Sequence, residues 1–222
     1  MPTPIETLFI DLDDTLYPAS SGLWRDIRGR IDLYMRERLG IPADQVTALR
    51  RAYFEQYGTT LRGLERHYPI DKAEFLAFVH DLPLGEYIAP NPGLRELLQR
   101  IPARKFIFTN ADTAHAERVL TALGLEGCFD GVVDILAVSP HCKPMPASFE
   151  IALRLAGQAD PRNCVLLDDM PRTTLAAREL GMFSILVSEN GAQEANADAI
   201  LRDWSQLPAL LEEARTRSRD ES

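Results

Sequence analysis

The chain has 222 residues and carries 24 Lys and Arg against 33 Asp and Glu, which gives a formal net charge of −9. This length suits one large domain, or one domain with a sizeable insertion. The acidic balance argues against extended nucleic acid or an anionic membrane as a partner, because both require a broad basic surface. No apolar run approaches the roughly 18 residues that a membrane span needs.

The number of cysteines and the residues at the amino terminus indicate the cellular compartment of the protein. The three cysteines, Cys128, Cys142 and Cys164, are too few for a disulfide framework and too far apart for a CxxC pair. The first residues lack the basic and apolar regions of a signal peptide. We therefore expect a cytoplasmic protein, as a monomer or a homodimer.

Short apolar runs followed by helix-like stretches recur along the chain, and this alternation is typical of βα units around a buried parallel sheet. The predicted strands cover residues 7–10, 105–108, 131–135, 164–167 and 183–187. The predicted helices between them cover residues 113–123, 146–156 and 173–180. The fold class is therefore predicted as α/β, with a parallel sheet flanked by helices.

Residues 18–89 interrupt this alternation, because they show helical spacing and no convincing strand. Apolar side chains recur there at intervals of three and four residues, which packing explains better than a cofactor site. We interpret residues 18–89 as a helical insertion. Residues 1–17 and 90–222 then form the core, and both parts have ordinary domain sizes.

Carboxylates follow the first predicted strand, where Phe9-Ile10 runs into Asp11-Leu12-Asp13. Buried charge is costly unless it is paired or bound to a metal. In a strand, Asp11 and Asp13 project to the same side, at the carboxyl end where open parallel sheets bind ligands. An acidic turn or a helix cap is the alternative explanation.

A second acidic pair, Asp168-Asp169, follows the predicted strand 164–167. Two strand ends that each bear paired acids would form a four-carboxylate cluster, and such a cluster requires a cation. Mg²⁺ suits the site because it takes oxygen ligands and commonly shares them with a phosphate. A helix N-cap would explain a single pair, but two pairs favour a metal site.

Two further motifs could bind a phosphate. Thr109 and Asn110 follow the strand 105–108 and offer a hydroxyl and an amide, although such a pair alone is an ordinary turn. Lys143 stands in a Pro-flanked loop before a helix, where its cation could neutralise phosphate charge. In isolation, a surface lysine is the simpler interpretation.

Taken in order, these four elements resemble the motifs of the haloacid dehalogenase superfamily of phosphohydrolases. The resemblance covers the whole chain and implies a Rossmann-like core with an α-helical cap inserted between the first and second motifs. The four motifs stand here as Asp11-Leu12-Asp13-Asp14-Thr15, Thr109-Asn110, Lys143-Pro144 and Asp168-Asp169.

The resemblance implies a Mg²⁺-dependent phosphomonoester hydrolase. Asp11 would be the nucleophile that forms an aspartyl-phosphate, and Asp13 would be the general acid and base. Catalysis would also use Thr109, Asn110 and Lys143 to hold the transferring oxygens. The metal ligands would be Asp11, Asp13 (through its backbone carbonyl), Asp168 and Asp169.

The chain also resembles the pyrimidine 5′-nucleotidase-like branch, through residues 9–18, 57–64 and 82–90. This resemblance implies a nucleoside 5′-monophosphate as the small phosphorylated substrate. Arg62, in the segment that looks like the cap loop of the branch, is the candidate substrate contact, with a solvated helix arginine as the alternative. Met170 and Thr173 stand where the branch usually has Ser and Asn.

Other side chains and functions remain open at this point. His141 could contact substrate, and Tyr17 and Trp24 could offer stacking surface or could simply pack. The alternative activities are a sugar- or small-acid phosphate phosphatase and a phosphoglucomutase-type phosphotransferase. A catalytically idle binding protein with the same fold is a different class. Dehalogenase chemistry is disfavoured, because Asp13 would have no task in it.

Overall fold

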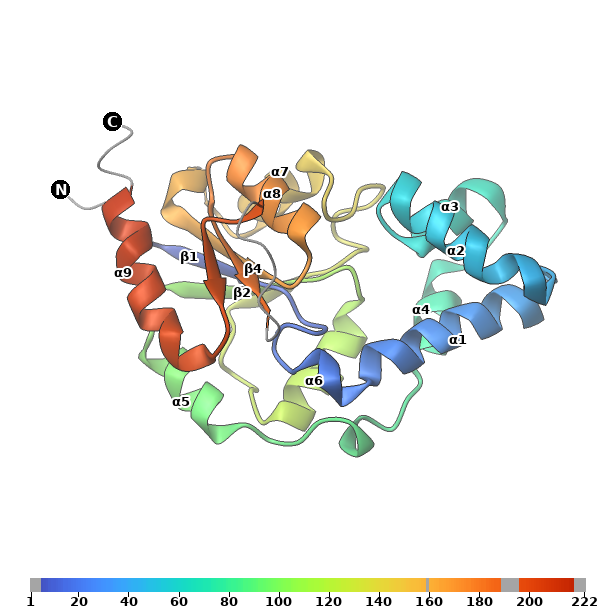
Figure 1. The fold of residues 1–222 in the computed structure, drawn as a ribbon, viewed down its shortest axis with the longest axis horizontal. Coiled ribbons are helices and arrows are strands. Elements are labelled where there is room, and N and C mark those ends of the chain that lie inside the picture. Colours follow the sequence, from blue (N-terminus) through green and yellow to red (C-terminus); the bar gives the residue numbers. More distant parts are fainter. Residues whose placement is uncertain (1–4, 159, 189–195, 218–222) are drawn as a thin grey trace.

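The computed structural model describes residues 5–158, 160–188 and 196–217. A six-stranded sheet forms its centre, with the strand order β3-β2-β1-β4-β5-β6 and parallel pairing throughout (Figure 1). The strands are β1 (Thr7–Ile10), β2 (Arg104–Phe108), β3 (Gly131–Val133), β4 (Cys164–Asp168), β5 (Phe183–Val187) and β6 (Ala199–Leu201). The sequence predicts the first five strands, whereas β6 is too short to show a periodicity.

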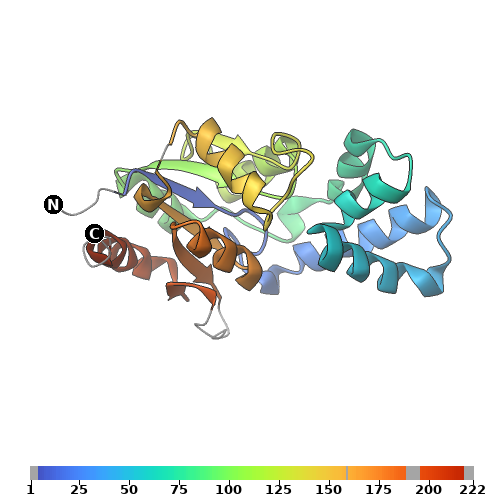
Figure 2. The same ribbon diagram turned by 90° about the horizontal axis from the view of Figure 1, so that it is seen from above.

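Helices cover both faces of the sheet, which is why the central strands bury apolar side chains on both of their faces. Phe9 and Phe108 pack on one face with helices α7 (Pro146–Leu155) and α8 (Pro171–Glu179). Leu8 and Ile10 point to the opposite face. The helices on that face are α5 (Pro92–Arg100), α6 (Thr113–Leu123) and α9 (Leu207–Arg217). Three layers result (Figures 1 and 2).

The observed helices follow the predicted ones closely in this part of the chain. Helix α6 has the predicted bounds and ends at Gly124, whose φ of 68° suits glycine. Helix α8 begins two residues earlier than predicted, because Pro171 occupies its first turn. Helix α5 was not predicted, since its start at Pro92-Gly93 reads as a break. There the side chain of Asn91 caps the helix by accepting a hydrogen bond from Leu94 N at 3.0 Å.

The segment 18–89 is helical, as the sequence predicts, and the structure gives four α-helices in it: α1 (Leu23–Glu37), α2 (Ala43–Tyr57), α3 (Thr60–His67) and α4 (Lys72–His80). We call these four the inserted helices. Helix α1 packs on α2 and α4, and α2 packs on α3. They lie together on one side of the core (Figures 1 and 2). The exact division of the chain at residues 18 and 89 remains a prediction.

Among the described residues, no helix combines the length and the apolar character that crossing a bilayer requires.

Candidate active site

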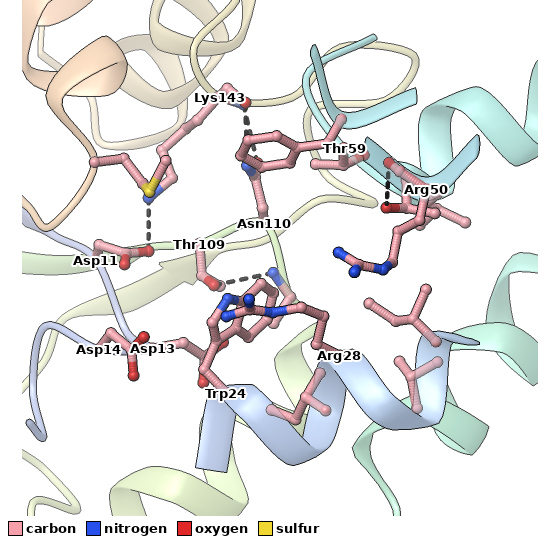
Figure 3. Close-up of a pocket in the computed structure, with 18 of the residues that line it drawn as sticks. Asp11, Asp13, Asp14, Trp24, Arg28, Arg50, Thr59, Thr109, Asn110 and Lys143 are labelled. Carbon is pink, nitrogen blue, oxygen red and sulfur yellow. Dashed lines mark hydrogen bonds and ion pairs between the residues drawn. The ribbon is translucent and has the colours of Figure 1, made fainter. Parts of the chain in front are cut away.

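A cavity of about 560 Å³ lies between the inserted helices and the carboxyl ends of the central strands (Figure 3). The core lines it with the predicted site residues, and the inserted helices add aromatic and basic side chains. The core contribution includes Asp11, Asp13, Thr109, Asn110, Lys143, Asp168 and Asp169. The sheet topology accounts for this gathering, because β1, β2 and β4 are neighbours whose carboxyl ends meet at one edge.

The buried carboxylate of Asp11 is paired with Lys143. Asp11 follows β1, and its amide donates to Leu167 O of the adjacent strand β4 at 2.9 Å. The ammonium of Lys143 lies 2.6 Å from Asp11 Oδ1 and 2.7 Å from Asp168 Oδ2. The hydroxyl of Thr15 donates a hydrogen bond to Asp11 Oδ2 at 3.2 Å. Lys143 and Thr15 therefore hold one oxygen each of the Asp11 carboxylate and fix its orientation.

Burial is the largest single influence on the pKa values of Asp11 and Lys143. The pKa of Asp11 is raised to about 7, because burial and the neighbouring charge of Asp168 raise it by more than Lys143 lowers it. Burial lowers the pKa of the Lys143 amine, but Asp11 and Asp168 more than reverse this, so its pKa lies above the ordinary value. Lys143 is therefore a permanent cation within the site.

Three carboxylates form an acidic trio at the strand ends. Asp11, Asp168 and Asp169 each offer an oxygen atom, and these atoms lie within 4.8 Å of one another. Burial and the neighbouring charges of Asp168 and Asp11 raise the pKa of Asp169 to about 9. Closely spaced carboxylates that are costly to ionise together are the donor set that a hard divalent cation such as Mg²⁺ prefers. The trio therefore fits the metal that the sequence predicts.

The side chain of Asp13 does not join this trio, so the expected cluster of four carboxylates is wrong. Its Oδ1 accepts hydrogen bonds from Tyr17 OH at 2.6 Å and from the His115 ring at 2.9 Å. The reason is local, because β1 ends at Ile10 and the chain turns through Asp14, whose φ is 58°. Strand alternation therefore no longer applies at Asp13, and its side chain lies outside the acidic trio.

Polar contacts also determine the state of the Asp13 carboxylate. Burial raises its pKa, but the His115 ring, aided by His80 and Tyr17, outweighs burial and holds the pKa below its usual value.

Thr109 and Asn110 have different surroundings. The hydroxyl oxygen of Thr109 accepts a hydrogen bond from Ala111 N at 3.0 Å, which leaves its proton for another acceptor. The amide of Asn110 pairs with the backbone of Lys143, donating to Lys143 O at 3.1 Å and accepting from Lys143 N at 2.9 Å (Figure 3). Asn110 thus holds the lysine loop in place.

Arg62 does not line the cavity. Its buried guanidinium donates to Ile135 O at 2.5 Å, to His141 O at 2.7 Å and to Glu65 Oε2 at 2.6 Å. These contacts join α3 to the core loop before Lys143. In this structure Arg62 therefore bridges the two parts of the chain, and its donors are occupied by protein acceptors.

Other residues singled out in the sequence lie as follows. Tyr17 is buried and hydrogen-bonded to Asp13, and Trp24 lines the cavity (Figure 3). His141 contributes its carbonyl oxygen to Arg62. Met170 and Thr173 both line the cavity beside the acidic trio.

Sequence reasoning missed two histidines and three arginines. His115 and His80 have stacked rings, and His115 contacts Asp13. The only sequence signal for His115 is the helix start just beyond Thr109, and His80, at the end of α4, has none. Arg28 and Arg50 reach into the cavity from α1 and α2 (Figure 3). Arg172 lies on the ring of Phe54 and donates to Phe54 O at 3.0 Å. The spacing of Arg28, one turn after Trp24, is the signal that could have identified it.

Comparisons with known proteins agree with the fold. The model of the haloacid dehalogenase-like hydrolase family matches residues 5–181. The chain is 28% identical over 233 residues to phosphate metabolism protein 8 of Saccharomyces cerevisiae, covering 93% of this chain and 73% of the yeast protein. It is 27% identical to fructose-1-phosphate phosphatase YqaB of Escherichia coli, covering 80% of this chain and 94% of that protein.

Solved structures share the fold. The crystal structure of β-phosphoglucomutase from Clostridium difficile matches with a TM-score of 0.62 at 19% identity, covering 96% of this chain and 98% of the mutase chain. With a family model matched over most of its length and the motif residues gathered at one sheet edge, this chain belongs to the haloacid dehalogenase-like hydrolases.

Proposed function

We propose that this protein is a phosphatase that hydrolyses a small phosphorylated metabolite through an aspartyl-phosphate on Asp11, with Mg²⁺ as its cofactor. The observation that carries this proposal is the placement of the Asp11 carboxylate. It lies at the base of a cavity, 2.6 Å from the Lys143 ammonium and within the acidic trio. The yeast and Escherichia coli relatives, by their names, act in phosphate metabolism and on a sugar phosphate, which supports phosphatase chemistry.

The first step transfers the phosphoryl group to the protein. An oxygen of Asp11 forms a bond to phosphorus as the bond from phosphorus to the alcohol oxygen breaks. The negative charge of the bound phosphate favours the protonated form of Asp13. Asp13 gives this proton to the departing oxygen, so that an alcohol leaves rather than an alkoxide. Acid–base assistance of this kind is typically worth about 10²- to 10⁴-fold in rate.

The second step releases phosphate. Water forms a bond to phosphorus, the bond between phosphorus and the Asp11 oxygen breaks, and Asp13 takes the proton of the water. Lys143 and the Thr109 hydroxyl bind the phosphoryl oxygens, and Asn110 holds the Lys143 backbone. The cycle returns both aspartates to their initial states.

Asp11, Asp168 and Asp169 would hold Mg²⁺, with the backbone carbonyl of Asp13 as a further ligand. When bound, the ion supplies positive charge that offsets the repulsion between the substrate dianion and the nucleophilic carboxylate.

A pyrimidine nucleoside 5′-monophosphate is our proposed substrate, and residues 18–89 are the proposed cap that recognises it. The cavity, of about 560 Å³, lies in the range of about 300–1,000 Å³ that is usual for small-molecule sites. Trp24 offers an aromatic surface for a base. Arg28 offers hydrogen-bond donors, which match the carbonyl oxygens of a pyrimidine ring.

A sugar phosphate is the second candidate substrate. The likeness to fructose-1-phosphate phosphatase YqaB favours it, and an arginine-lined cavity also suits sugar oxygens or a second phosphate group. A phosphoglucomutase-type transfer would use the same Asp11 chemistry. It would deliver the phosphoryl group to a second hydroxyl instead of to water.

The test is a phosphate-release screen with Mg²⁺ and with a chelator. Its substrates are UMP, CMP, AMP, GMP, deoxynucleotides, fructose 1-phosphate and phosphoglycolate. Faster release from UMP and CMP than from the purine nucleotides supports the nucleotidase proposal, whereas equal rates overturn it and leave the phosphatase proposal in place. Asp11→Asn should abolish release, with Asp44→Asn on the exposed start of α2 as the matched control. Substantial activity in Asp11→Asn would contradict the mechanism.

A further inference from the structure

We propose that His115 is a positioning residue for Asp13: with Tyr17 it binds one oxygen of that carboxylate, Oδ1, and so reserves Oδ2 for the catalytic proton. The inference rests on the proposed phosphatase function and assigns a task to a side chain that the motifs of the sequence do not include.

The first evidence is the sharing of Oδ1. The Nε2 atom of His115 lies 2.9 Å from Asp13 Oδ1, and the Tyr17 hydroxyl donates to the same oxygen at 2.6 Å. Among the described residues, no hydrogen bond engages Oδ2. The Asp13 side chain keeps 12% of its surface exposed, and Asp13 lines the cavity. A proton on Oδ2 therefore displaces no existing hydrogen bond, whereas a proton on Oδ1 would.

The second evidence is the environment of the His115 ring, which identifies its donor atom. Nδ1 of His115 is buried and has no hydrogen-bond partner among the described residues. A proton on Nδ1 would be a buried donor without an acceptor, which is costly. Because a carboxylate oxygen only accepts hydrogen bonds, the ring nitrogen that faces it, Nε2, must carry a proton. His115 then donates to Asp13, and Oδ1 receives two donated hydrogen bonds.

The third evidence is how firmly the ring is held. The His115 side chain has no exposed surface, and the ring of His80 stacks on it with the centroids 4.1 Å apart and the planes at 14°. His80 is fixed in turn by its Nδ1 atom, 3.0 Å from Asp112 Oδ1. Asp112 also caps α6, the helix that carries His115. The support of Asp13 thus comes from α6 of the core and from α4 of the inserted helices.

The consequence is specific to the leaving group. An alkyl phosphate needs a proton on its departing oxygen, whereas 4-nitrophenyl phosphate releases a stable phenolate without one. A displaced Asp13 therefore slows the first step for alkyl phosphates only. Because kcat/KM reports this first irreversible step, the ratio of kcat/KM values for the two substrate types measures Asp13 placement, and a general loss of folded protein leaves that ratio unchanged.

The experiment compares His115→Phe, which keeps a flat ring against His80 and removes the donor, with His115→Gln, which supplies an amide donor. The substrates are UMP, fructose 1-phosphate and 4-nitrophenyl phosphate. For His115→Phe we expect kcat/KM on the alkyl phosphates to fall about 10- to 100-fold and to change little on the aryl phosphate. His115→Gln should recover most of the loss. His67→Phe, an exposed histidine of α3 away from the cavity, is the matched control.

Equal losses on all substrates, or a glutamine variant no better than the phenylalanine variant, would overturn the inference and leave the phosphatase proposal intact. Tyr17→Phe removes the other donor to Oδ1 and should give the same split, so the test does not depend on the folding of one variant. If the wild-type protein hydrolyses none of the three phosphates, the proposed function fails and the inference fails with it.

Discussion

The ammonium of Lys143 lies 2.6 Å from Asp11 Oδ1, and both side chains are almost completely buried. The same ammonium also contacts Asp168 at 2.7 Å, so one cation serves two carboxylates. In the absence of a metal, Lys143 is the charge that allows Asp11 to ionise in this setting.

Lys143→Met removes that charge. The pKa of Asp11 should rise further above its already raised value of about 7, and one contact to the phosphoryl oxygens is lost. We expect kcat to fall by about 10²- to 10³-fold, the usual cost of removing one preorganised group at a site of developing charge. Lys72→Met on α4, a half-exposed partner of Glu65, is the control and should leave kcat unchanged. A Lys143→Met enzyme with most of its activity would show that the pair is structural.

The strand ends could be predicted from the sequence because they depend on strong local signals. Apolar runs buried on both faces define β1 and β4, and each ends in acids that the parallel sheet must bring to one edge. The sequence predicts a cation at Lys143 for the phosphate, whereas the ion pair between Lys143 and Asp11 is seen only in the structure.

The direction of individual side chains could not be predicted. The turn at Asp14 rotates Asp13 away from the acidic trio and toward His115, 102 positions along the chain. Arg62 looks the same in sequence whether it meets substrate or backbone carbonyls, because the choice is made by the loop at Ile135 and His141. Such contacts depend on how the inserted helices meet the core, which local periodicity does not describe.

Stability should depend on pH in a direction set by the raised carboxyl pKa values. Asp11 and Asp169, with pKa values of about 7 and about 9 against 3.8 ordinarily, hold protons in the folded chain that the unfolded chain has already released. The free energy of unfolding of the metal-free protein therefore falls as the pH rises from about 4 to about 9.

Mg²⁺ should oppose this trend, because it replaces the protons of the acidic trio. It therefore binds more tightly at higher pH, where the carboxyl groups lose their protons more easily. We expect the increase in melting temperature caused by Mg²⁺, relative to a chelator, to grow between about pH 6 and about pH 9. Thermal denaturation at several pH values measures it, and Asp169→Asn should remove much of the effect. An increase that is constant with pH would contradict the assignment of the trio as the metal site.

Arg62→Ala should destabilise the fold. The substitution leaves the carbonyl oxygens of Ile135 and His141 without their charged donor and removes the buried contact to Glu65. We expect the free energy of unfolding to fall by about 3 kcal/mol, measured by urea denaturation. Arg66→Ala, an exposed position on the same helix, should change it by less than about 0.5 kcal/mol. A rise in KM at unchanged stability would instead make Arg62 a substrate contact.

Arg28→Ala should raise KM and leave the free energy of unfolding unchanged, which is the opposite of the effect expected for Arg62→Ala. Arg28 is exposed on α1 and extends into the cavity (Figure 3), and it forms no hydrogen bond or ion pair with the described residues, so its removal should leave stability unchanged. If its guanidinium binds substrate oxygens, KM should rise about 10-fold or more while kcat changes little, because a charge-assisted hydrogen bond contributes about 1.5–3 kcal/mol. Arg25→Ala, on the same helix but paired with Asp26 outside the cavity, is the matched control. An unchanged KM for both UMP and fructose 1-phosphate would exclude Arg28 from recognition of either substrate, and the choice between them would then depend on Trp24 and the threonines at the start of α3.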